Sequence, residues 1–158
     1  MSIIVDVSAD GTRTALASAR VKRVATAVLR AEGVRDALVS IAFVSAREIA
    51  RLNKRHLAHG GPTDVISFAL GARRSRSAAH PVVGDIYIAP EVARANATRF
   101  GRGVREELAR LVIHGTLHVL GHDHPDGTDR TSSPMWRRQE RLLSSASIRR
   151  ALSGAREP

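Results

Sequence analysis

The spacing of hydrophobic and polar positions changes several times along the chain, and each change predicts a new secondary-structure element. Four segments show the alternation or the short apolar run of a β-strand, and these are residues 2–7, 37–44, 64–70 and 82–89. Other segments repeat apolar residues three and four positions apart, which predicts helices. The helical segments are residues 14–31, 45–56, 90–100 and 104–120, with a last helix after Ser133-Pro134.

Local signals support several of these boundaries. Gly33 and Gly121 stand where helix C-terminal caps are expected, and Ser45 with Glu48 forms a capping box at the start of its helix. Residues 71–80 form a polar Arg/Ser/Ala loop. No linker separates two halves of the 158-residue chain, so we expect one domain over residues 1–145 and a flexible C-terminal tail over residues 146–158.

Composition narrows the classes of function. The net charge of +10, from 25 basic and 15 acidic residues, favours a polyanionic partner, although charge alone does not choose between RNA, DNA and an acidic protein. The absence of cysteine excludes disulfides, so any transition-metal site must use His, Asp or Glu. The N-terminus does not resemble a signal peptide, and no apolar run approaches the ~20 residues of a membrane span. We therefore expect a cytoplasmic protein with no membrane partner.

Three histidines have the spacing of a metal site. His114 and His118 lie four residues apart in a predicted helix, so both imidazoles project from one face. Gly121 allows the chain to leave the helix through a positive-φ conformation and to bring His124 to the same ion. These offsets match the zinc-protease pattern H-E-x-x-H-x-x-G-x-x-H. Three protein ligands leave one coordination position open, which is typical of catalytic zinc, so we expect one Zn²⁺ per chain.

One residue of the protease pattern is missing, and two neighbouring residues have open roles. Gly115 occupies the position of the glutamate that serves as general base in peptide hydrolysis, which disfavours that chemistry. His122 is a rival third ligand if the helix continues past Gly121; otherwise it contacts the site or substrate, or is simply exposed. Asp123 either orients a ligand imidazole or closes a turn through its own backbone.

These residues resemble the YbeY-type rRNA maturation endoribonucleases of bacteria. The family hallmark H-G-x-L-H-(L/V)-x-G-(Y/H)-D-H is matched at every defined position from His114 to His124. Two further blocks of the family fit, and these are Leu52-Asn53 followed by Pro62 to Phe68, and the strand Gly84-Asp85-Ile86. Isolated family positions also agree at Glu107-Leu108, Met135 and Glu140.

The resemblance implies an α+β fold: a single compact domain with a small mixed four-stranded sheet, about five helices and a metzincin-like metal helix. It also implies zinc held by His114, His118 and His124, and metal-dependent cleavage of single-stranded RNA. The implied role is 16S rRNA 3′-end maturation and ribosome quality control, on the 16S rRNA precursor and the ribosome or its small subunit, with no DNA substrate expected.

One departure from the family concerns catalysis. Many members carry an arginine where this chain has Leu57, and leucine cannot pair with a phosphate. Arg55, His56 or His59 could replace it, since all lie in the same segment, and we take His114, Arg55 and His59 as catalytic candidates.

Three further residues are candidates for contacts beside the metal or with substrate. Asp85 interrupts a strand, where an acid is unfavourable unless it faces the cleft or pairs with an arginine. Arg102 and Arg105 precede the metal helix and suit phosphate binding. Two alternatives to a nuclease stay open, and these are a zinc peptidase and a non-catalytic ribosome-associated factor with a structural metal.

Overall fold

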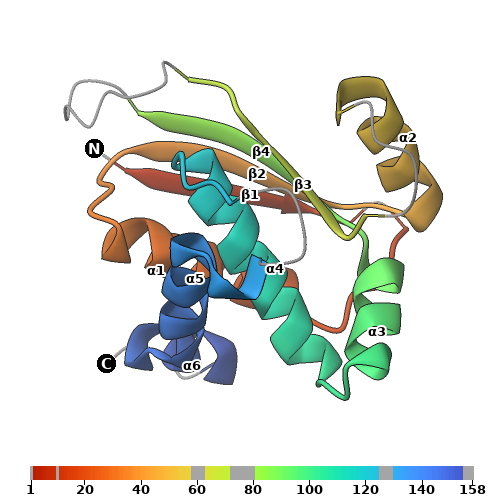
Figure 1. The fold of residues 1–158 in the computed structure, drawn as a ribbon. Coiled ribbons are helices and arrows are strands. Elements are labelled where there is room, and N and C mark those ends of the chain that lie inside the picture. Colours follow the sequence, from red (N-terminus) through yellow and green to blue (C-terminus); the bar gives the residue numbers. More distant parts are fainter. Residues whose placement is uncertain (1, 10, 58–62, 72–80, 125–129, 155–158) are drawn as a thin grey trace.

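Four strands form one mixed sheet in the computed structural model, which describes residues 2–9, 11–57, 63–71, 81–124 and 130–154 (Figure 1). The strands are β1 (Ile3–Ser8), β2 (Ala37–Phe43), β3 (Val65–Ala69) and β4 (Val82–Ile88). Their order across the sheet is β1-β2-β4-β3. β1, β2 and β4 are mutually parallel, and β3 pairs antiparallel with β4 as an edge strand.

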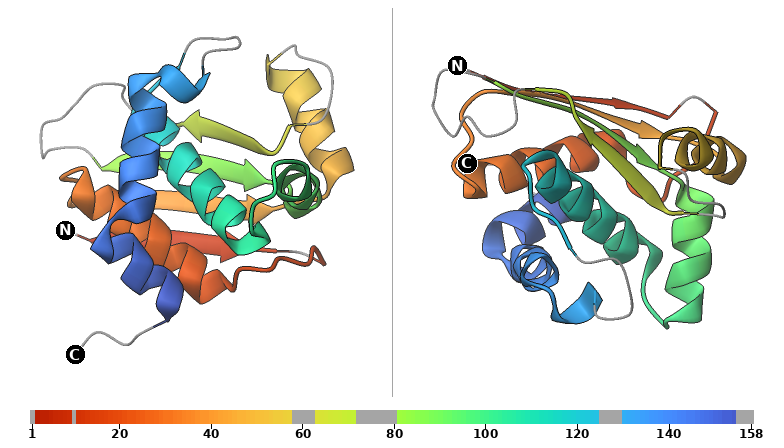
Figure 2. Two further views of the ribbon diagram at one scale, coloured as in Figure 1. Left: turned by 60° about the horizontal axis from the view of Figure 1, so that its bottom comes forward. Right: turned by 45° about the horizontal axis from the view of Figure 1, so that its top comes forward.

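Six α-helices and one 3-10 turn complete the described residues. They are α1 (Ser18–Ala31), α2 (Ala46–Leu57), α3 (Pro90–Arg99), α4 (Val104–Val119), η1 (Arg130–Ser132), α5 (Pro134–Ser144) and α6 (Ala146–Ser153). α1 and α4 cover one face of the sheet, and α5 and α6 pack on their outer side (Figure 2). The main core lies between these helices and the sheet. No helix of the described residues is long and apolar enough to cross a membrane.

Two glycines set how closely α4 approaches the sheet. A Cβ added to Gly115 on α4 would lie 2.7 Å from Ile86 Cγ2 of β4. A Cβ added to Gly84 on β4 would lie 2.4 Å from Val119 Cγ1 of α4. Both distances are far inside van der Waals contact, so each glycine leaves room for a side chain of the opposite element. The helix that carries His114 and His118 is therefore fixed against β4 by close packing.

The α+β class, the mixed four-stranded sheet and every predicted strand and helix are confirmed, with boundaries displaced by a few residues. The capping hydroxyl of Ser45 accepts a hydrogen bond from Glu48 N at 3.1 Å, as its sequence predicts. Gly33 and Gly121 both adopt positive φ, of 79° and 97°.

The expected C-terminal tail is wrong for residues 146–153, which form a sixth helix, α6, one more than the sequence predicted. Ser145 caps this helix by accepting from Ile148 N at 3.4 Å. Ile148 is fully buried and Ala151 nearly so. Arg23 of α1 donates to the Ala151 carbonyl at 3.4 Å, which joins the helix to α1. The burial of two apolar side chains offsets the short length of the helix.

Candidate metal centre

The three histidines of the metal motif lie together at the C-terminal half of α4. His114 and His118 project from α4, and His124 reaches them from the segment that follows Gly121. The ring centroids are 4.7 Å apart for His114 and His118, 5.3 Å for His114 and His124, and 5.0 Å for His118 and His124. One ring nitrogen from each imidazole lies within 4.8 Å of the other two. All three side chains are half-buried, so a shared ion would be reachable by substrate.

The donor set fits zinc. Three nitrogens at ~2.0–2.1 Å from one tetrahedral ion lie roughly 3.3 Å apart, so the observed cluster needs only small side-chain rotations to close on it. Three neutral imidazoles leave a fourth position for substrate, and no carboxylate of the described residues belongs to the group.

Gln139 of α5 orients the first ligand. Its amide oxygen lies 2.7 Å from His114 Nδ1, while its amide nitrogen donates to Glu140 at 3.2 Å, which fixes the direction of the amide. An amide oxygen only accepts hydrogen bonds, so the contact keeps the His114 proton on Nδ1 and leaves the Nε2 lone pair for a metal. No motif in the sequence marks Gln139 as a site residue.

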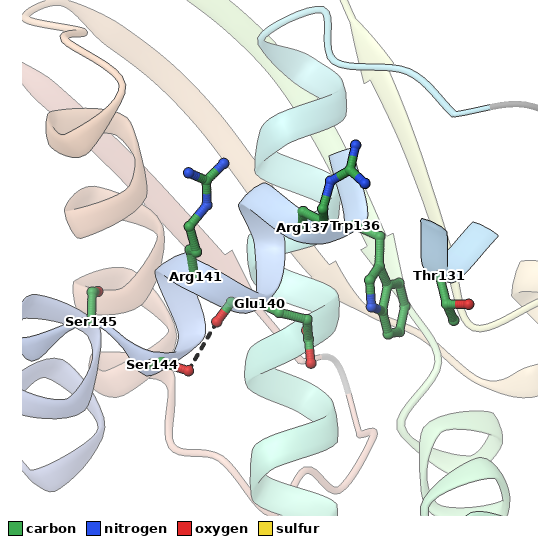
Figure 3. A pocket seen from close by; sticks show the side chains of 7 residues that line it. All are labelled: Thr131, Trp136, Arg137, Glu140, Arg141, Ser144 and Ser145. Atoms are coloured by element: carbon green, nitrogen blue, oxygen red, sulfur yellow. Dashed lines mark hydrogen bonds between the residues drawn. The ribbon is translucent and has the colours of Figure 1, made fainter. Parts of the chain in front are cut away.

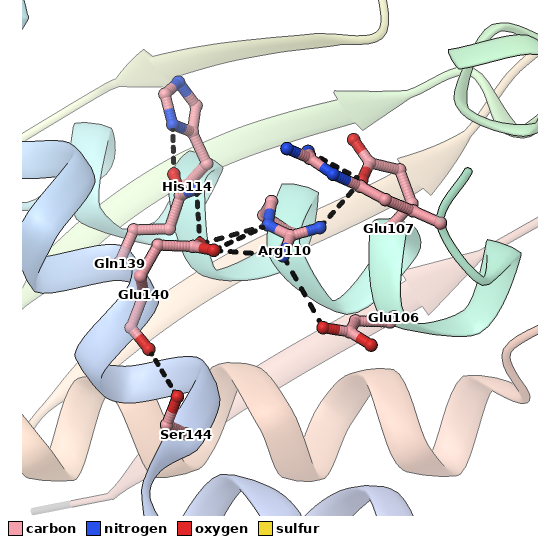
Figure 4. A network of polar contacts seen from close by, with 8 residues as sticks. Glu106, Glu107, Arg110, His114, Gln139, Glu140 and Ser144 are labelled. Carbon is pink, nitrogen blue, oxygen red and sulfur yellow. Dashed lines mark hydrogen bonds and ion pairs between the residues drawn. The ribbon is translucent and has the colours of Figure 1, made fainter. Parts of the chain in front are cut away.

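A charged network continues from Gln139 into the protein (Figure 4). Arg110 donates from Nε and Nη2 to Glu140, at 3.0 Å for the shorter Nε contact, and from Nη1 to Glu107 at 2.8 Å. Arg110 and Glu107 are buried, and Glu140 is about one-third exposed. Burial opposes ionisation of Glu140, but the hydrogen bonds from Arg110 and Gln139 outweigh it and lower the Glu140 pKa. Burial lowers the pKa of Arg110, but its hydrogen bonds to Glu140 and Glu107 raise it by more.

A second ion-pair cluster holds the segment that carries His124. Glu32, at the C-terminal cap of α1, accepts from Arg138 Nε of α5 at 2.6 Å and lies 3.1 Å from His122 Nε2. Burial raises the pKa of Glu32, but its hydrogen bonds to Arg138 and His122 lower it by more. His122 is thus turned toward α1 and α5, and Gly121 separates it from the ligand face of α4. Two elements therefore anchor the chain just before His124.

The Asp123 side chain bonds to the backbone of the turn that follows α4. Its Oδ1 accepts from the backbone N–H of His124 at 2.9 Å, and its side chain is exposed. Of the two roles that the sequence left open, this bond matches the closing of a turn.

The position of Gly115 bears on the peptidase alternative. Gly115 faces Ile86 and Val65 of the sheet, and a Cβ there would already collide with Ile86. A glutamate at this position has no room without moving α4, so the general base of the zinc-protease pattern has no counterpart here.

Several predicted site residues lie away from the three histidines. Asp85 accepts from Ser40 Oγ at 2.6 Å, and it points to the face of the sheet opposite α4, because its neighbours Gly84 and Ile86 face α4. This contradicts a role for Asp85 beside the metal ligands, since the sheet itself stands between them. Its acidic side chain is satisfied by a hydroxyl rather than by an arginine.

Arg102 and Arg105 lie at the far end of α4. Arg105 precedes His114 by nine residues of helix, which is about 14 Å along the axis. Arg102 is engaged by Glu107 at 3.6 Å and lies over the Phe100 ring, 5.5 Å from its centroid. Neither arginine therefore lies beside the three histidines, and their contact with substrate phosphate stays a prediction.

The remaining candidates lie near Leu57, where many family members carry an arginine. Arg55 is exposed on α2, and no contact in the described structure joins it to the three histidines. His59 lies outside the described residues, as do the side chains of His56 and Leu57.

A family model described as endoribonuclease YbeY matches residues 6–147. This chain belongs to the YbeY endoribonuclease family. A relative from Bacillus subtilis is 36% identical over 127 residues, covering 76% of this chain and 80% of its own. One from Syntrophus aciditrophicus is 34% identical over 124 residues, covering 78% of both chains. Each of these relatives is named endoribonuclease YbeY.

The fold has a counterpart among solved structures. The solution structure of a Thermotoga maritima protein aligns with a TM-score of 0.60 at 24% identity and covers 98% of both chains. Two of the YbeY family positions noted from the sequence, Glu107 and Glu140, supply two of the three carboxylates bound by Arg110, and Glu106 is the third. The family pattern therefore includes the support of the histidines as well as the histidines themselves.

Replacing Gln139 by leucine should weaken zinc binding by roughly 10- to 100-fold, the usual cost of removing an outer partner of a metal ligand. Without the amide acceptor, the His114 proton and ring orientation are no longer fixed. Competition with a chromophoric zinc chelator measures the affinity. Ser144→Ala on the same helix is the control, because Ser144 is exposed and bonds only the Glu140 carbonyl. Unchanged affinity in Gln139→Leu would show that Gln139 does not position the ligand.

Proposed function

We propose that this protein is a zinc-dependent endoribonuclease that cleaves single-stranded RNA at the His114, His118 and His124 centre. The observation that carries the proposal is the convergence of these three half-buried imidazoles in a chain of the YbeY endoribonuclease family. The expected substrate is the 3′ end of the 16S rRNA precursor on the ribosome or its small subunit, with a further part in ribosome quality control. Because ribosomal RNA matures where ribosomes assemble, the activity belongs in the cytoplasm.

Each residue of the site has a distinct role in this proposal. His114, His118 and His124 would hold the ion, Gln139 sets the tautomer of His114, and the cluster around Glu32 holds the approach to His124. Zinc bound there would supply Lewis acidity to a phosphodiester oxygen. The net charge of +10 attracts the polyanionic substrate. The missing carboxylate at Gly115 suits RNA better than peptide, since RNA carries its own 2′-hydroxyl nucleophile.

The test compares substrates on one preparation. The zinc-loaded protein and His114→Ala, each checked for folding by circular dichroism, are assayed on single-stranded RNA, on duplex RNA and on casein. We expect cleavage of single-stranded RNA only, reduced by more than ~100-fold in the variant. Cleavage of casein would instead identify a peptidase. A folded, zinc-loaded protein that cuts none of these substrates would refute the nuclease and favour a ribosome-associated factor with a structural metal.

A further inference from the structure

A shallow groove runs along the outer side of α5 (Figure 3). We call it the α5 groove; it is lined by Thr131, Trp136, Arg137, Glu140, Arg141 and two serines at its far end. Its helical residues are spaced so that they share one side of α5. Gln139, which contacts His114, follows Trp136 by three residues, which is about 4.5 Å along the helix axis. The groove thus begins within one helical turn of the residue that positions a metal ligand.

Two exposed arginines, which form no ion pair within the described residues, give the groove positive charge. Arg137 and Arg141 are exposed, lie four residues apart, and form no ion pair within the described residues. Other arginines nearby are occupied, since Arg138 binds Glu32 and Arg110 binds Glu140. Like charges one turn apart disfavour a helix, so an anion that bridged Arg137 and Arg141 would relieve their repulsion.

The carboxylate of the groove does not cancel this charge. Glu140 lines the groove, but Arg110 engages both of its oxygens. The hydrogen bonds from Arg110 and Gln139 lower the Glu140 pKa and direct its carboxylate toward the inner side of the helix. Within the described residues, Arg137 and Arg141 therefore form no ion pair with Glu140 and stay exposed on the outer side.

Trp136 gives the groove an aromatic surface. It is the one tryptophan of the chain, and its side chain is only half-buried, next to Thr131 (Figure 3). The buried side of α5 is formed by Met135, Gln139, Leu142 and Leu143, so the indole stands at the edge of the core. In the described part of the chain its N–H has no hydrogen-bond acceptor, and no unpaired side-chain nitrogen there is buried, so this N–H faces solvent.

We propose that the α5 groove binds the single-stranded RNA substrate, with a base stacked on Trp136 and consecutive phosphates on Arg137 and Arg141. An aromatic platform with cations along one track is the chemistry that holds single strands without reading their sequence. Guanidinium groups bind phosphate through two parallel hydrogen bonds. Stacking on an indole requires an unpaired base, so the groove selects single strands over duplexes. This inference rests on the proposed function and assigns the substrate track of that site.

The sole tryptophan makes stacking directly measurable. Titrating the His118→Ala protein, which lacks one metal ligand and should not cleave RNA, with a 12-nucleotide uridine RNA should quench Trp136 fluorescence to saturation. Anisotropy of a dye-labelled copy of this RNA gives the dissociation constant of every variant. Arg137→Glu/Arg141→Glu should weaken binding at least 10-fold and reduce the salt slope by about 1.4, from two lost phosphate contacts at ~0.7 each. Trp136→Ala should weaken binding roughly 5-fold or more, and Trp136→Phe should recover part of the loss.

The matched control makes the same change in charge elsewhere. Arg13 and Arg94 are exposed and form no ion pair in the described structure. Arg94 belongs to α3, which lies away from α5 in Figure 1, and Arg13 belongs to the segment between β1 and α1. Arg13→Glu/Arg94→Glu should therefore bind RNA within about 2–3-fold of the unmodified chain, apart from the general effect of net charge. Melting temperatures identify any variant that fails to fold, and Trp136→Phe keeps the test open if Trp136→Ala does.

The outcomes separate this inference from the proposed function. RNA that binds without quenching Trp136, and equally well in both double-glutamate variants, would overturn the inference while cleavage by the unmodified chain left the function intact. Groove-dependent binding by a protein that cuts no RNA would support the inference and refute the nuclease. Groove-dependent binding of polyglutamate but not of RNA would overturn the inference in favour of an acidic protein partner.

Discussion

Replacing Arg110 by methionine is expected to lower the free energy of unfolding by about 3–4 kcal/mol, because removing one member of a buried ion-pair cluster leaves its partners uncompensated. Arg110 and Glu107 are 7% and 6% exposed, and Arg110 also binds Glu140. Methionine preserves most of the side-chain volume, so the loss is mainly electrostatic. Urea unfolding followed by circular dichroism measures the change.

The control is Arg105→Met, which removes an exposed arginine from the same helix. It should change the free energy of unfolding by no more than about 0.5 kcal/mol. Equal effects of the two substitutions would mean that the charges around Arg110 contribute little to stability.

Lowering the pH should reduce the difference in the free energy of unfolding between the unmodified chain and Arg110→Met. Arg110 holds the pKa of Glu140 below its ordinary value of 4.5. The stabilisation linked to that lowered pKa is complete above the unfolded-state pKa and is lost as pH falls through the folded-state pKa. The two stabilities should therefore converge below about pH 4.5. A difference in the free energy of unfolding that stayed constant on acidification would assign the loss to packing.

The second large effect concerns the third ligand, where two histidines compete. His124→Ala should weaken zinc binding by more than about 100-fold, since even the outer partners of metal ligands are worth 10- to 100-fold. RNA cleavage should fall in parallel if the proposed function is correct. His122→Ala is the matched control, because it removes an imidazole two residues away that lies against Glu32. It should retain zinc affinity within about 10-fold.

Zinc content after dialysis and chelator competition separate the two histidines. The reverse result, with zinc lost in His122→Ala and kept in His124→Ala, would show that the helix continues through Gly121 in the metal-bound protein. That outcome would replace the ligand set derived from the positive φ of Gly121.

Local chemistry explains what the sequence could predict. The strands and helices follow from periods of two and 3.6, and the ligand set follows from an i, i+4 pair and a glycine that reverses the chain, all within eleven residues. The pairing of Glu140 with Arg110 needed the structure, because the two residues are 30 positions apart in the sequence.

Long-range geometry explains the errors. Gln139 is 25 residues from His114 and has no motif of its own, so only the packing of α5 on α4 reveals it. Asp85 was misplaced because strand alternation gives two faces without saying which one α4 covers. The distance of Arg105 from the ligands follows from the helix itself, since nine residues separate it from His114 along the axis. The helix α6 was missed because eight residues with two buried apolar side chains give a weak period.

The close packing of α4 on β4, through Gly115 against Ile86 and Gly84 against Val119, has a consequence for how the ion is loaded. Two of the three imidazoles lie on a helix whose position is fixed by contacts that involve no metal, and the third already lies close enough to share the ion after a small side-chain rotation. Such a metal site forms during folding and binds its ion afterwards. Zinc binding and release should therefore change the α-helical circular dichroism signal very little.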